Sequence, residues 1–297
     1  MKHKAGFVNI IGFPNVGKST LLNKLIDNRL SIITSKPQTT RHRILGIYND
    51  PDHQIVFSDT PGIIRDPNYG MQESMNAFAY STFQDADLML LMTDPFDEYS
   101  TEDRIIRLLQ ERNFPLFILI NKIDLKEQEV IQLIINKWEE LLTPEKIFPI
   151  SALHDIGTND LIPQIKLIIP NSPPYYPKDQ LSDRNLRFFV AEIIREKILG
   201  LYKQEIPYSC EVIVEEFLEK DEKNISLTKI YASIYVSRKT QKAILIGKGG
   251  SAIKKLGIQS RESIEQFLDE KIYLELNVKV KDNWRDDERT LKHFGYK

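Results

Sequence analysis

Cysteine and long apolar segments are both scarce in this chain. Its 297 residues include a single cysteine, Cys210, so an intrachain disulfide and a cysteine-based metal site are excluded. The longest strongly apolar runs, Leu88–Met92 and Leu116–Ile120, are far shorter than the roughly 20 residues of a membrane-spanning helix. An apolar segment begins directly after residue 6, which leaves no room for a signal peptide. We therefore expect a cytoplasmic protein, and peripheral contact with the inner face of the cell membrane stays open.

A strong excess of one charge is absent as well. The formal net charge is −2, so the chain as a whole has no general attraction to nucleic acid. The charges are unevenly distributed, because residues 1–182 carry 18 basic and 23 acidic side chains, whereas residues 183–297 carry 22 and 19. A chain of this length has room for two domains with separate cores. The basic charge therefore leans towards the C-terminal part.

A phosphate-binding loop is predicted close to the N-terminus. The segment Gly12–Thr20 has the pattern G-x-x-x-x-G-K-[ST], between a strand-like run at Phe7–Ile11 and a helical pattern at Leu21–Ile26. Such a turn points its backbone N–H groups at one spot, at the positive end of the helix dipole. Lys18 is then expected to reach the β- and γ-phosphates, and the Ser19 hydroxyl to bind Mg²⁺. The predicted nucleotide-binding residues of this loop are Gly12, Phe13, Pro14, Asn15, Val16, Gly17, Lys18, Ser19 and Thr20.

Two later segments have the composition of loops that sense the γ-phosphate. Polar and basic residues fill Ser31–Arg43, where a threonine hydroxyl would complete the coordination of Mg²⁺; a connecting loop without a special role fits this composition equally well. The strand-like run Gln54–Ser58 ends in Asp59-Thr60-Pro61-Gly62. A carboxylate at this end of a strand is well placed to hold a Mg²⁺-bound water, and the glycine would let the chain approach the γ-phosphate.

The nucleotide base is predicted from a further segment, Asn121-Lys122-Ile123-Asp124, which directly follows a strand-like run. Asp124 can accept hydrogen bonds from N1–H and the 2-amino group of guanine, whereas adenine would leave this carboxylate unpaired. Asn121 can bond towards O6 and N7, and the Lys122 stem can cover the ring. Backbone amides of a later turn could contact O6, and that turn comprises Ser151, Ala152 and Leu153. Together these residues favour GTP over ATP.

The order of these motifs resembles a known family. Strand-like and helical patterns alternate through the first part of the chain, which predicts an α/β domain with a doubly wound, mostly parallel sheet. The phosphate loop followed by Gln38–Arg43, Asp59–Gly62 and Asn121–Asp124 resembles the bacterial Era-type GTPases. The resemblance implies hydrolysis of GTP to GDP and phosphate with Mg²⁺ as cofactor. It favours Thr40 over Thr39 as the metal-binding threonine, beside Ser19 and Asp59.

One position departs from the pattern of Ras-like enzymes. Ile63 follows Gly62, so no glutamine is present there to orient the attacking water. Some relatives with an apolar residue at this position use a potassium ion contacted by an asparagine of the phosphate loop, and Asn15 occupies that position here. We therefore expect hydrolysis stimulated by K⁺, with Asn15, Lys18, Thr40 and Gly62 as the catalytic residues.

A proline-rich segment divides the chain. Four prolines among residues 169–177 favour an extended spacer, so we predict a GTP-binding domain at 1–172, a linker at 173–182 and a second domain at 183–297. In the second domain we expect a helix capped by Asp183, two strands (Cys210–Glu219 and Ser226–Ser237), two helices and a final strand. The turn Gly247-Lys248-Gly249-Gly250 joins the two helices. This order, with its G-x-x-G turn, matches an α+β KH domain of the bacterial type.

Basic charge accompanies the G-x-x-G turn. Seven basic residues and no acidic residue occur from Arg238 to Arg261, and glycines between helices let a nucleic-acid backbone approach without a clash with Cβ. A solvated helical hairpin is the alternative. The predicted RNA-binding residues are Arg238, Lys239, Lys242, Ile246, Gly247, Lys248, Gly249, Gly250, Lys254 and Lys255.

The resemblance to the Era family extends over nearly the whole chain and implies a cellular role. Relatives with this layout bind the 3′ region of small-subunit ribosomal RNA and assist maturation of the small ribosomal subunit, so we expect the same of this chain, acting as a monomer. Two alternatives stay open: an RNA-binding scaffold that senses GTP but hardly hydrolyses it, and a GTPase with a protein or membrane target. The sequence does not decide where the charged and aromatic tail, residues 283–297, docks.

Overall fold

The structure, a computed structural model, describes residues 3–34, 36–220 and 227–296. The chain divides into two compact units, each with its own hydrophobic core. Unit 1 comprises Met1–Ser31, Thr40–Pro67 and Met75–Asp183, and unit 2 comprises Ile32–Thr39, Asn68–Ser74 and Arg184–Lys297. Two short stretches of the N-terminal half therefore belong to the C-terminal unit.

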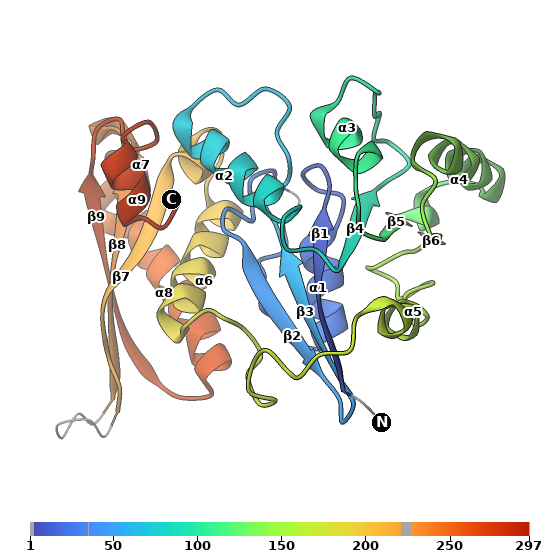
Figure 1. The fold of residues 1–297 in the computed structure, drawn as a ribbon. Helices are drawn as coiled ribbons and strands as arrows, with labels where there is room; N and C mark the ends of the chain where they lie inside the picture. The colour runs from blue at the N-terminus through green and yellow to red at the C-terminus, as the bar shows by residue number, and fades with distance from the viewer. Residues whose placement is uncertain (1–2, 35, 221–226, 297) are drawn as a thin grey trace. The chain divides into compact units, whose positions relative to one another are not determined.

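Unit 1 is built on a six-stranded sheet (Figure 1) with the strand order β2-β3-β1-β4-β5-β6. Neighbouring strands are parallel except for the antiparallel pair β2 and β3, so the predicted doubly wound, mostly parallel sheet is confirmed. Strands β4 and β5 are buried along their whole length, which is why they read as continuous apolar runs. The strands are β1 (Lys4–Ile11), β2 (Ile44–Asn49), β3 (His53–Asp59), β4 (Leu88–Thr93), β5 (Leu116–Ile120) and β6 (Lys146–Pro149).

Helices cover both faces of this sheet (Figure 1). They are α1 (Lys18–Ile26), α2 (Gly70–Ser81), α3 (Arg104–Gln110), the 3₁₀ turn η1 (Ile123–Leu125), α4 (Gln128–Leu142) and α5 (Leu161–Ile168). In parallel strands the carboxyl ends meet at one edge of the sheet. The chain adds β3 on one side of β1 and β4 on the other, so the strand order reverses between β1 and β4. The segments that follow β1, β3, β4 and β5 are therefore brought together there, as in other open α/β sheets that bind ligands.

The proline-rich segment lies along unit 1. The Gln54 side chain on β3 accepts hydrogen bonds from the backbone N–H groups of Tyr175 (2.7 Å) and Tyr176 (3.0 Å). Further along, Ile47 on β2 donates its N–H to the carbonyl of Leu181 at 2.9 Å. Because β2 is the edge strand of the sheet, the segment satisfies backbone groups that would otherwise be unpaired.

Asp183 does not cap the helix that follows it, contrary to the prediction. Its carboxylate accepts the backbone N–H of Leu45 on the edge strand β2 at 3.1 Å. Helix α6 (Leu186–Leu201) begins after Asn185, whose side chain accepts the N–H of Phe188 at 3.0 Å. Both residue types are good N-caps. Because the Asp183 carboxylate pairs with β2, Asn185 caps the helix.

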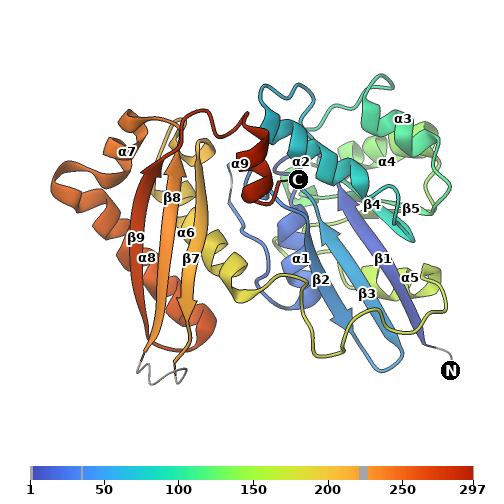
Figure 2. The ribbon, with the colours of Figure 1, turned by 60° about the vertical axis from the view of Figure 1, so that its left-hand side comes forward.

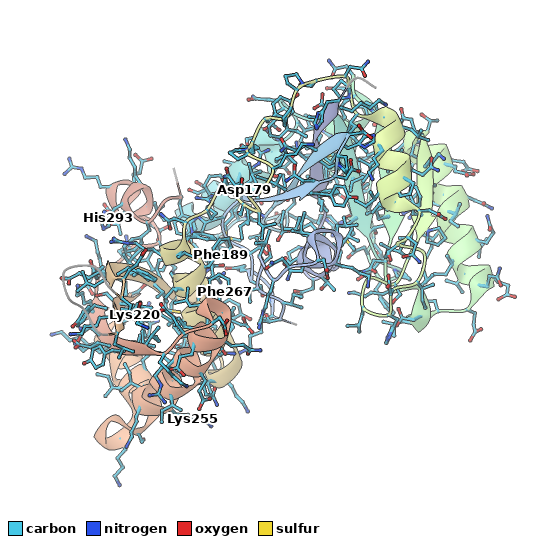
Figure 3. The ribbon with its side chains drawn as sticks, turned by 90° about the horizontal axis from the view of Figure 1, so that it is seen from below. Asp179, Phe189, Lys220, Lys255, Phe267 and His293 are labelled. Carbon is cyan, nitrogen blue, oxygen red and sulfur yellow. The ribbon has the colours of Figure 1, made fainter. Side chains whose placement is uncertain are left out.

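Unit 2 consists of a three-stranded sheet with the order β7-β8-β9, in which β7 and β8 are antiparallel and β8 and β9 parallel. Helices α6 and α8 pack on one face of this sheet (Figure 2). Figure 3 marks Phe189 of α6 and Phe267 of α8, whose ring centroids are 5.8 Å apart. The predicted KH order is confirmed, although Ser226, the predicted start of the second strand, lies outside the described residues. The elements of unit 2 after α6 are η2 (Ile206–Tyr208), β7 (Cys210–Leu218), β8 (Thr228–Val236), α7 (Lys239–Ile246), η4 (Lys248–Gly250), α8 (Ser251–Leu268), β9 (Ile272–Val280) and α9 (Glu288–His293).

The C-terminal tail docks on unit 2, a point that the sequence left open. Trp284 is fully buried and donates its indole N–H to the carbonyl of Ser209 at 3.1 Å. The hydroxyl of Tyr296 donates to the buried carboxylate of Glu211 at 2.6 Å. Within the described ranges, no helix is both long enough and apolar enough to cross a membrane.

Candidate nucleotide-binding and RNA-binding sites

The phosphate loop joins β1 to α1 and requires glycine at two positions. Gly12 and Gly17 have φ values of +151° and +106°, which other residues rarely adopt. A Cβ at Gly12 would lie 2.1 Å from the carbonyl oxygen of Met92, and one at Gly17 would lie 2.3 Å from Nδ2 of Asn121. The loop is thus packed directly against the ends of β4 and β5.

Lys18 is buried in this loop, where its ammonium group bonds to backbone carbonyls. Its Nζ donates to the carbonyl oxygens of Gly12 (3.1 Å) and Phe13 (2.8 Å). Burial lowers the pKa of Lys18 to about 8, although Asp59 and Asp97 raise it. A bound phosphate would favour the charged form of this lysine.

Three oxygen-bearing side chains from different segments converge beside Lys18. Ser19 Oγ donates to Asp59 Oδ2 at 2.8 Å and lies 2.9 Å from Thr40 Oγ1. Thr40 Oγ1 is 3.4 Å from the same carboxylate oxygen. Thr39 is engaged elsewhere, because its hydroxyl donates to the carbonyl of Lys36 at 2.6 Å. The hydroxyl that meets Ser19 and Asp59 is therefore that of Thr40.

The chemistry of this cluster fits a divalent cation. Asp59 is fully buried, and its Oδ1 makes no hydrogen bond with any residue that the structure describes. Burial raises the pKa of Asp59, and Lys18 opposes this shift. Mg²⁺ prefers oxygen ligands, which Ser19, Thr40 and Asp59 supply. A cation here would stabilise the charged form of this carboxylate.

Gly62 lies directly against Pro14 of the phosphate loop. A Cβ at this position would lie 2.6 Å from both N and Cα of Pro14. The following N–H, of Ile63, donates to the carbonyl of Gly12 at 3.1 Å, and the Ile63 side chain is buried in the core. Ile63 therefore offers no polar group to a water near the γ-phosphate. Asn15 is exposed at the loop, with a φ of +66°.

Two other residues of these motifs pack inward. The Thr60 hydroxyl donates to the carbonyl of Ile10 at 2.8 Å, and the Val16 side chain is fully buried. These residues shape the backbone of the site through packing and hydrogen bonds within the protein.

The amide of Asn121 joins two segments of the site. It donates to the carbonyl of Val16 at 2.7 Å and accepts the N–H of Ala152 at 2.9 Å. These two bonds tie the phosphate loop to the 151–153 turn. The amide NH2 has a second N–H, so the predicted bond towards the guanine base stays a prediction. The N–H of Ser151 is likewise used, by the carbonyl of Ile156 at 2.9 Å. Leu153, in contrast, is 77% exposed.

Lys122 and Asp124 remain at the surface of this edge. Lys122 Nζ lies 2.5 Å from Asp94 Oδ2, which fixes the lysine stem. Asp124 is exposed, and its Oδ2 lies 3.7 Å from His154 Nε2. Its carboxylate is therefore accessible to the N1–H and 2-amino donors of a guanine base.

An acidic pair after β4 was missed in the sequence. Asp94 and Asp97 follow the carboxyl end of that strand, and burial together with Asp94 raises the pKa of Asp97 to about 6. Lys122 and Lys18 lie near enough to oppose the shift. The position of Thr93-Asp94 at the end of a buried strand was the available signal.

A stacked cluster also escaped sequence analysis. The ring of Phe13 in the phosphate loop stacks on Tyr99 with centroids 4.3 Å apart, and the Arg65 guanidinium lies over the Phe13 ring, 4.2 Å from its centroid. Arg65 also makes two hydrogen bonds of 3.0 Å to the carboxylate of Asp103. The loop after Gly62 is thereby fastened to the phosphate loop.

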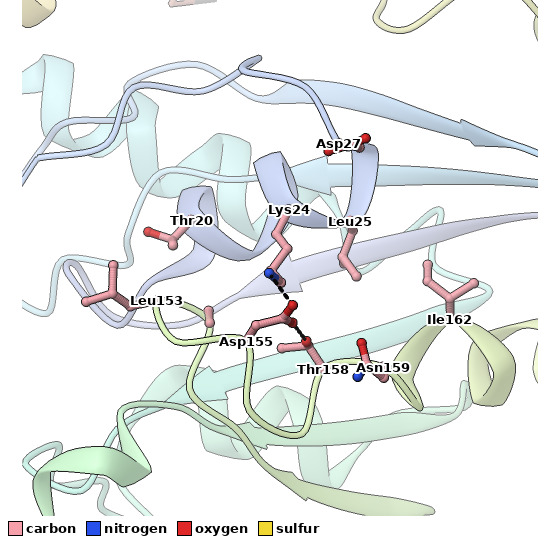
Figure 4. A pocket seen from close by; sticks show the side chains of 10 residues that line it. Thr20, Lys24, Leu25, Asp27, Leu153, Asp155, Thr158, Asn159 and Ile162 are labelled. Carbon is pink, nitrogen blue, oxygen red and sulfur yellow. Dashed lines mark hydrogen bonds and ion pairs between the residues drawn. The ribbon is translucent and has the colours of Figure 1, made fainter.

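A cavity of about 560 Å³ lies between α1 and the segment after β6 (Figure 4). Lys24 of α1 points to Asp155, with Nζ 2.9 Å from Oδ2, and Asp155 also accepts a hydrogen bond from the Thr158 hydroxyl. Thr20, Ala152 and Leu153 line the same cavity. It therefore borders the turn that we expected near guanine O6.

The G-x-x-G turn in unit 2 is open to solvent at two of its glycines. Gly247, Gly249 and Gly250 have φ values of +72°, +58° and +77°. A Cβ at Gly249 or Gly250 would meet no atom within 4 Å, whereas one at Gly247 would lie 2.7 Å from Cβ of Ala252. Gly247 is therefore required by packing, and the other two leave space for an approaching backbone.

Most of the predicted RNA-binding side chains are accessible. Lys242 and Ile246 are half-buried, and the exposed basic residues of this set are Arg238, Lys239, Lys248, Lys254 and Lys255. Ile244 beside the turn is 50% exposed, whereas Leu245 is fully buried. An apolar side chain next to exposed cations suits a groove for nucleotides.

Comparisons with known proteins agree with both halves of this description. A family model described as "50S ribosome-binding GTPase" matches residues 7–122, and one described as "KH domain" matches residues 205–285. The fold and the site thus define a P-loop GTPase with a C-terminal KH domain. The chain is 42% identical to GTPase Era of Alkaliphilus metalliredigens over the full length of both, and 44% identical to GTPase Era of Lactobacillus helveticus, over 99% of this chain and 96% of the relative. The chain belongs to the Era family of GTPases.

Two solved structures are similar over nearly the whole chain. Era in complex with MgGDPNP and nucleotides 1506–1542 of 16S ribosomal RNA has a TM-score of 0.92 and 37% identity, covering 99% of both chains. A variant of Aquifex aeolicus Era bound to GDP·AlF₄⁻ has a TM-score of 0.91 and 37% identity, with the same coverage. This protein is accordingly a GTPase that uses GTP and GDP with Mg²⁺.

Proposed function

We propose that this chain is a GTP-driven switch that binds small-subunit ribosomal RNA near its 3′ end and assists assembly of the small ribosomal subunit. The observation that carries this proposal is the likeness over 99% of both chains to an Era structure holding MgGDPNP and a 16S ribosomal RNA segment. The exposed basic residues around the open G-x-x-G turn support it independently. We propose that the protein works as a monomer in the cytoplasm and makes peripheral contact with the inner face of the cell membrane.

For the nucleotide, we propose that the phosphate loop holds the β- and γ-phosphates, with Lys18 donating to them. Ser19, Thr40 and Asp59 are the proposed holders of Mg²⁺, which supplies charge stabilisation to the phosphates when bound. The backbone N–H of Gly62 donates to the γ-phosphate. Since Ile63 is buried and apolar, we propose that K⁺ contacted by the exposed Asn15 contributes the remaining charge stabilisation.

For the base, we propose that Asp124 selects guanine. The test is the variant Asp124→Asn, which replaces a two-fold acceptor with a group that also donates. Affinity for GTP should fall by about 10- to 100-fold. Affinity for xanthosine triphosphate, which has a carbonyl in place of the 2-amino group, should rise. A variant that keeps its preference for GTP over xanthosine triphosphate would contradict this assignment.

The RNA target is tested by cross-linking the protein in cells and sequencing the bound RNA. Enrichment of the 3′ region of small-subunit ribosomal RNA is expected. No enriched RNA would favour the alternative, a GTPase with a protein or membrane target. The other alternative, a scaffold with negligible hydrolysis, is tested by single-turnover hydrolysis with and without K⁺ and RNA, where no rate increase in any condition would support it.

A further inference from the structure

Two buried oxygen atoms near the proposed metal site have no hydrogen-bond partner among the described residues. The Ser31 side chain is 2% exposed, and its Oγ makes no hydrogen bond with the described residues. The same is true of Oδ1 of the fully buried Asp59. A buried polar group without a partner costs about 1–3 kcal/mol, so two such atoms in one region require an explanation.

The Ser31 hydroxyl is near enough to the Asp59 carboxylate to lower its pKa. Burial raises the pKa of Asp59, and the groups that lower it are Lys18 and the hydroxyls of Ser19, Ser31 and Thr40. Ser19 and Thr40 both face Oδ2 of this carboxylate. The Ser31 hydroxyl is therefore available to the other oxygen, Oδ1.

Ser31 is held in place by Asn23 on α1. The Asn23 side chain accepts the backbone N–H groups of Leu30 (2.9 Å) and Ser31 (2.8 Å), and it donates to the carbonyl of Ser31 at 2.8 Å. Because Asn23 lies four residues after Ser19, both side chains project from the same face of the helix. Three hydrogen bonds from one side chain thus fix Ser31 relative to the helix that carries Lys18 and Ser19.

Ser31 is the last residue of the first segment of unit 1. Unit 1 is interrupted directly after Ser31, and residues 32–39 belong to unit 2. The chain returns to unit 1 at Thr40, which meets Ser19 and Asp59. Ser31 therefore remains with the phosphate loop whatever residues 32–39 do.

We propose that Ser31 is a positioning residue for the metal-binding carboxylate. Its hydroxyl donates to Asp59 Oδ1 and orients the carboxylate for Mg²⁺ and a metal-bound water, while Asn23 holds Ser31 in register. Hydrogen bonds that orient a metal ligand commonly change metal affinity by about 10- to 100-fold. The inference rests on the proposed role of Asp59 in holding Mg²⁺.

The experiment measures Mg²⁺ affinity without measuring hydrolysis. Release of a fluorescent GDP analogue from the full-length protein is followed over a range of Mg²⁺ concentrations and in excess EDTA. For Ser31→Ala, the Mg²⁺ concentration that gives half-maximal slowing should rise by about 3- to 30-fold. The release rate in EDTA should stay within about twofold of wild type, since the hydroxyl acts only through the metal site. Asn23→Ala should move the Mg²⁺ midpoint in the same direction.

A matched control variant distinguishes the positioning role of Ser31 from a nonspecific loss of structure near the metal site. Ser58 is a fully buried serine on β3 next to Asp59, but its hydroxyl accepts from Arg43 Nε at 2.7 Å. Ser58→Ala should leave the Mg²⁺ midpoint unchanged. A wild-type midpoint for Ser31→Ala, or equal changes in Mg²⁺ and in EDTA, would overturn the inference. Asp59→Ala tests separately whether Asp59 holds Mg²⁺. If this variant keeps the wild-type dependence on Mg²⁺, Asp59 is not a metal ligand.

Discussion

The sharpest test of the RNA-binding surface is a change at Gly249. This residue has a φ of +58°, and a Cβ there would meet no atom within 4 Å. Asparagine and aspartate adopt this backbone region more readily than other side chains. Gly249→Asn and Gly249→Asp should therefore both fold, with a similar small loss of stability, and they differ only in one negative charge.

The size of the effect follows from the charge. A carboxylate about 6 Å from one phosphate, at an effective dielectric constant of about 40–80, repels it by about 0.7–1.4 kcal/mol. This energy corresponds to a loss of affinity of about 3- to 10-fold. The surrounding surface carries exposed cations such as Lys248 and Lys254, so the loss from Gly249→Asp adds to any steric loss that Gly249→Asn already shows.

The assay is titration of a labelled RNA that corresponds to nucleotides 1506–1542 of 16S ribosomal RNA, the segment in the similar Era structure. It is run at about 0.1 M and about 1 M salt. Because the Debye length falls from about 10 Å to about 3 Å, the difference between the aspartate and asparagine variants should nearly vanish at high salt. GTP affinity should be unchanged in both. Equal RNA affinity of the two variants at low salt would refute the placement of a phosphate beside this turn.

Three further predictions concern the nucleotide site. Gly62→Ala places a Cβ 2.6 Å from the Pro14 backbone, so the two segments must separate by about 1 Å. Competition titrations should show that affinity for a GTP analogue falls at least about tenfold more than affinity for GDP. Equal losses of affinity for the two nucleotides would contradict a contact between Gly62 and the γ-phosphate. Asn15→Ala should abolish any rate advantage of K⁺ over Na⁺ in GTP hydrolysis with GDP affinity retained, and a wild-type K⁺ response would exclude Asn15. Because the pKa of Asp97 is raised to about 6 in the folded protein, the wild type loses stability as pH rises from about 4 to about 6. Asp97→Asn should therefore raise Tm more at pH 7 than at pH 4.5, whereas a constant difference would contradict the shift.

The sequence alone predicted the sheet and the glycines because both depend on local chemistry. Gly12 and Gly17 have backbone conformations that other residues rarely adopt, so the motif requires glycine at these two positions. The apolar runs of β4 and β5 indicated burial on both faces. The same reasoning predicted the order of elements in unit 2, since periodicity and turn residues lie within each segment.

Only the tertiary structure decided which neighbouring polar residue faces which partner. Thr39 and Thr40 are adjacent and chemically identical, yet only the Thr40 hydroxyl lies 2.9 Å from Ser19. The sequence predicted only a bond from the Asn121 amide towards the base, and the structure adds bonds to Val16 and Ala152, which are distant in the sequence. Such choices depend on contacts between segments far apart in the chain, and no local pattern records them.

The same reason explains the segments without a motif. Polar and proline-rich residues 173–182 predicted a spacer, and only pairing with the edge strand β2 showed that they belong to unit 1. The tail gave no local signal for its docking, which the burial of Trp284 in unit 2 decided. Residue type determined what each segment of this protein can bind, and the packing of distant segments determined what each one does bind.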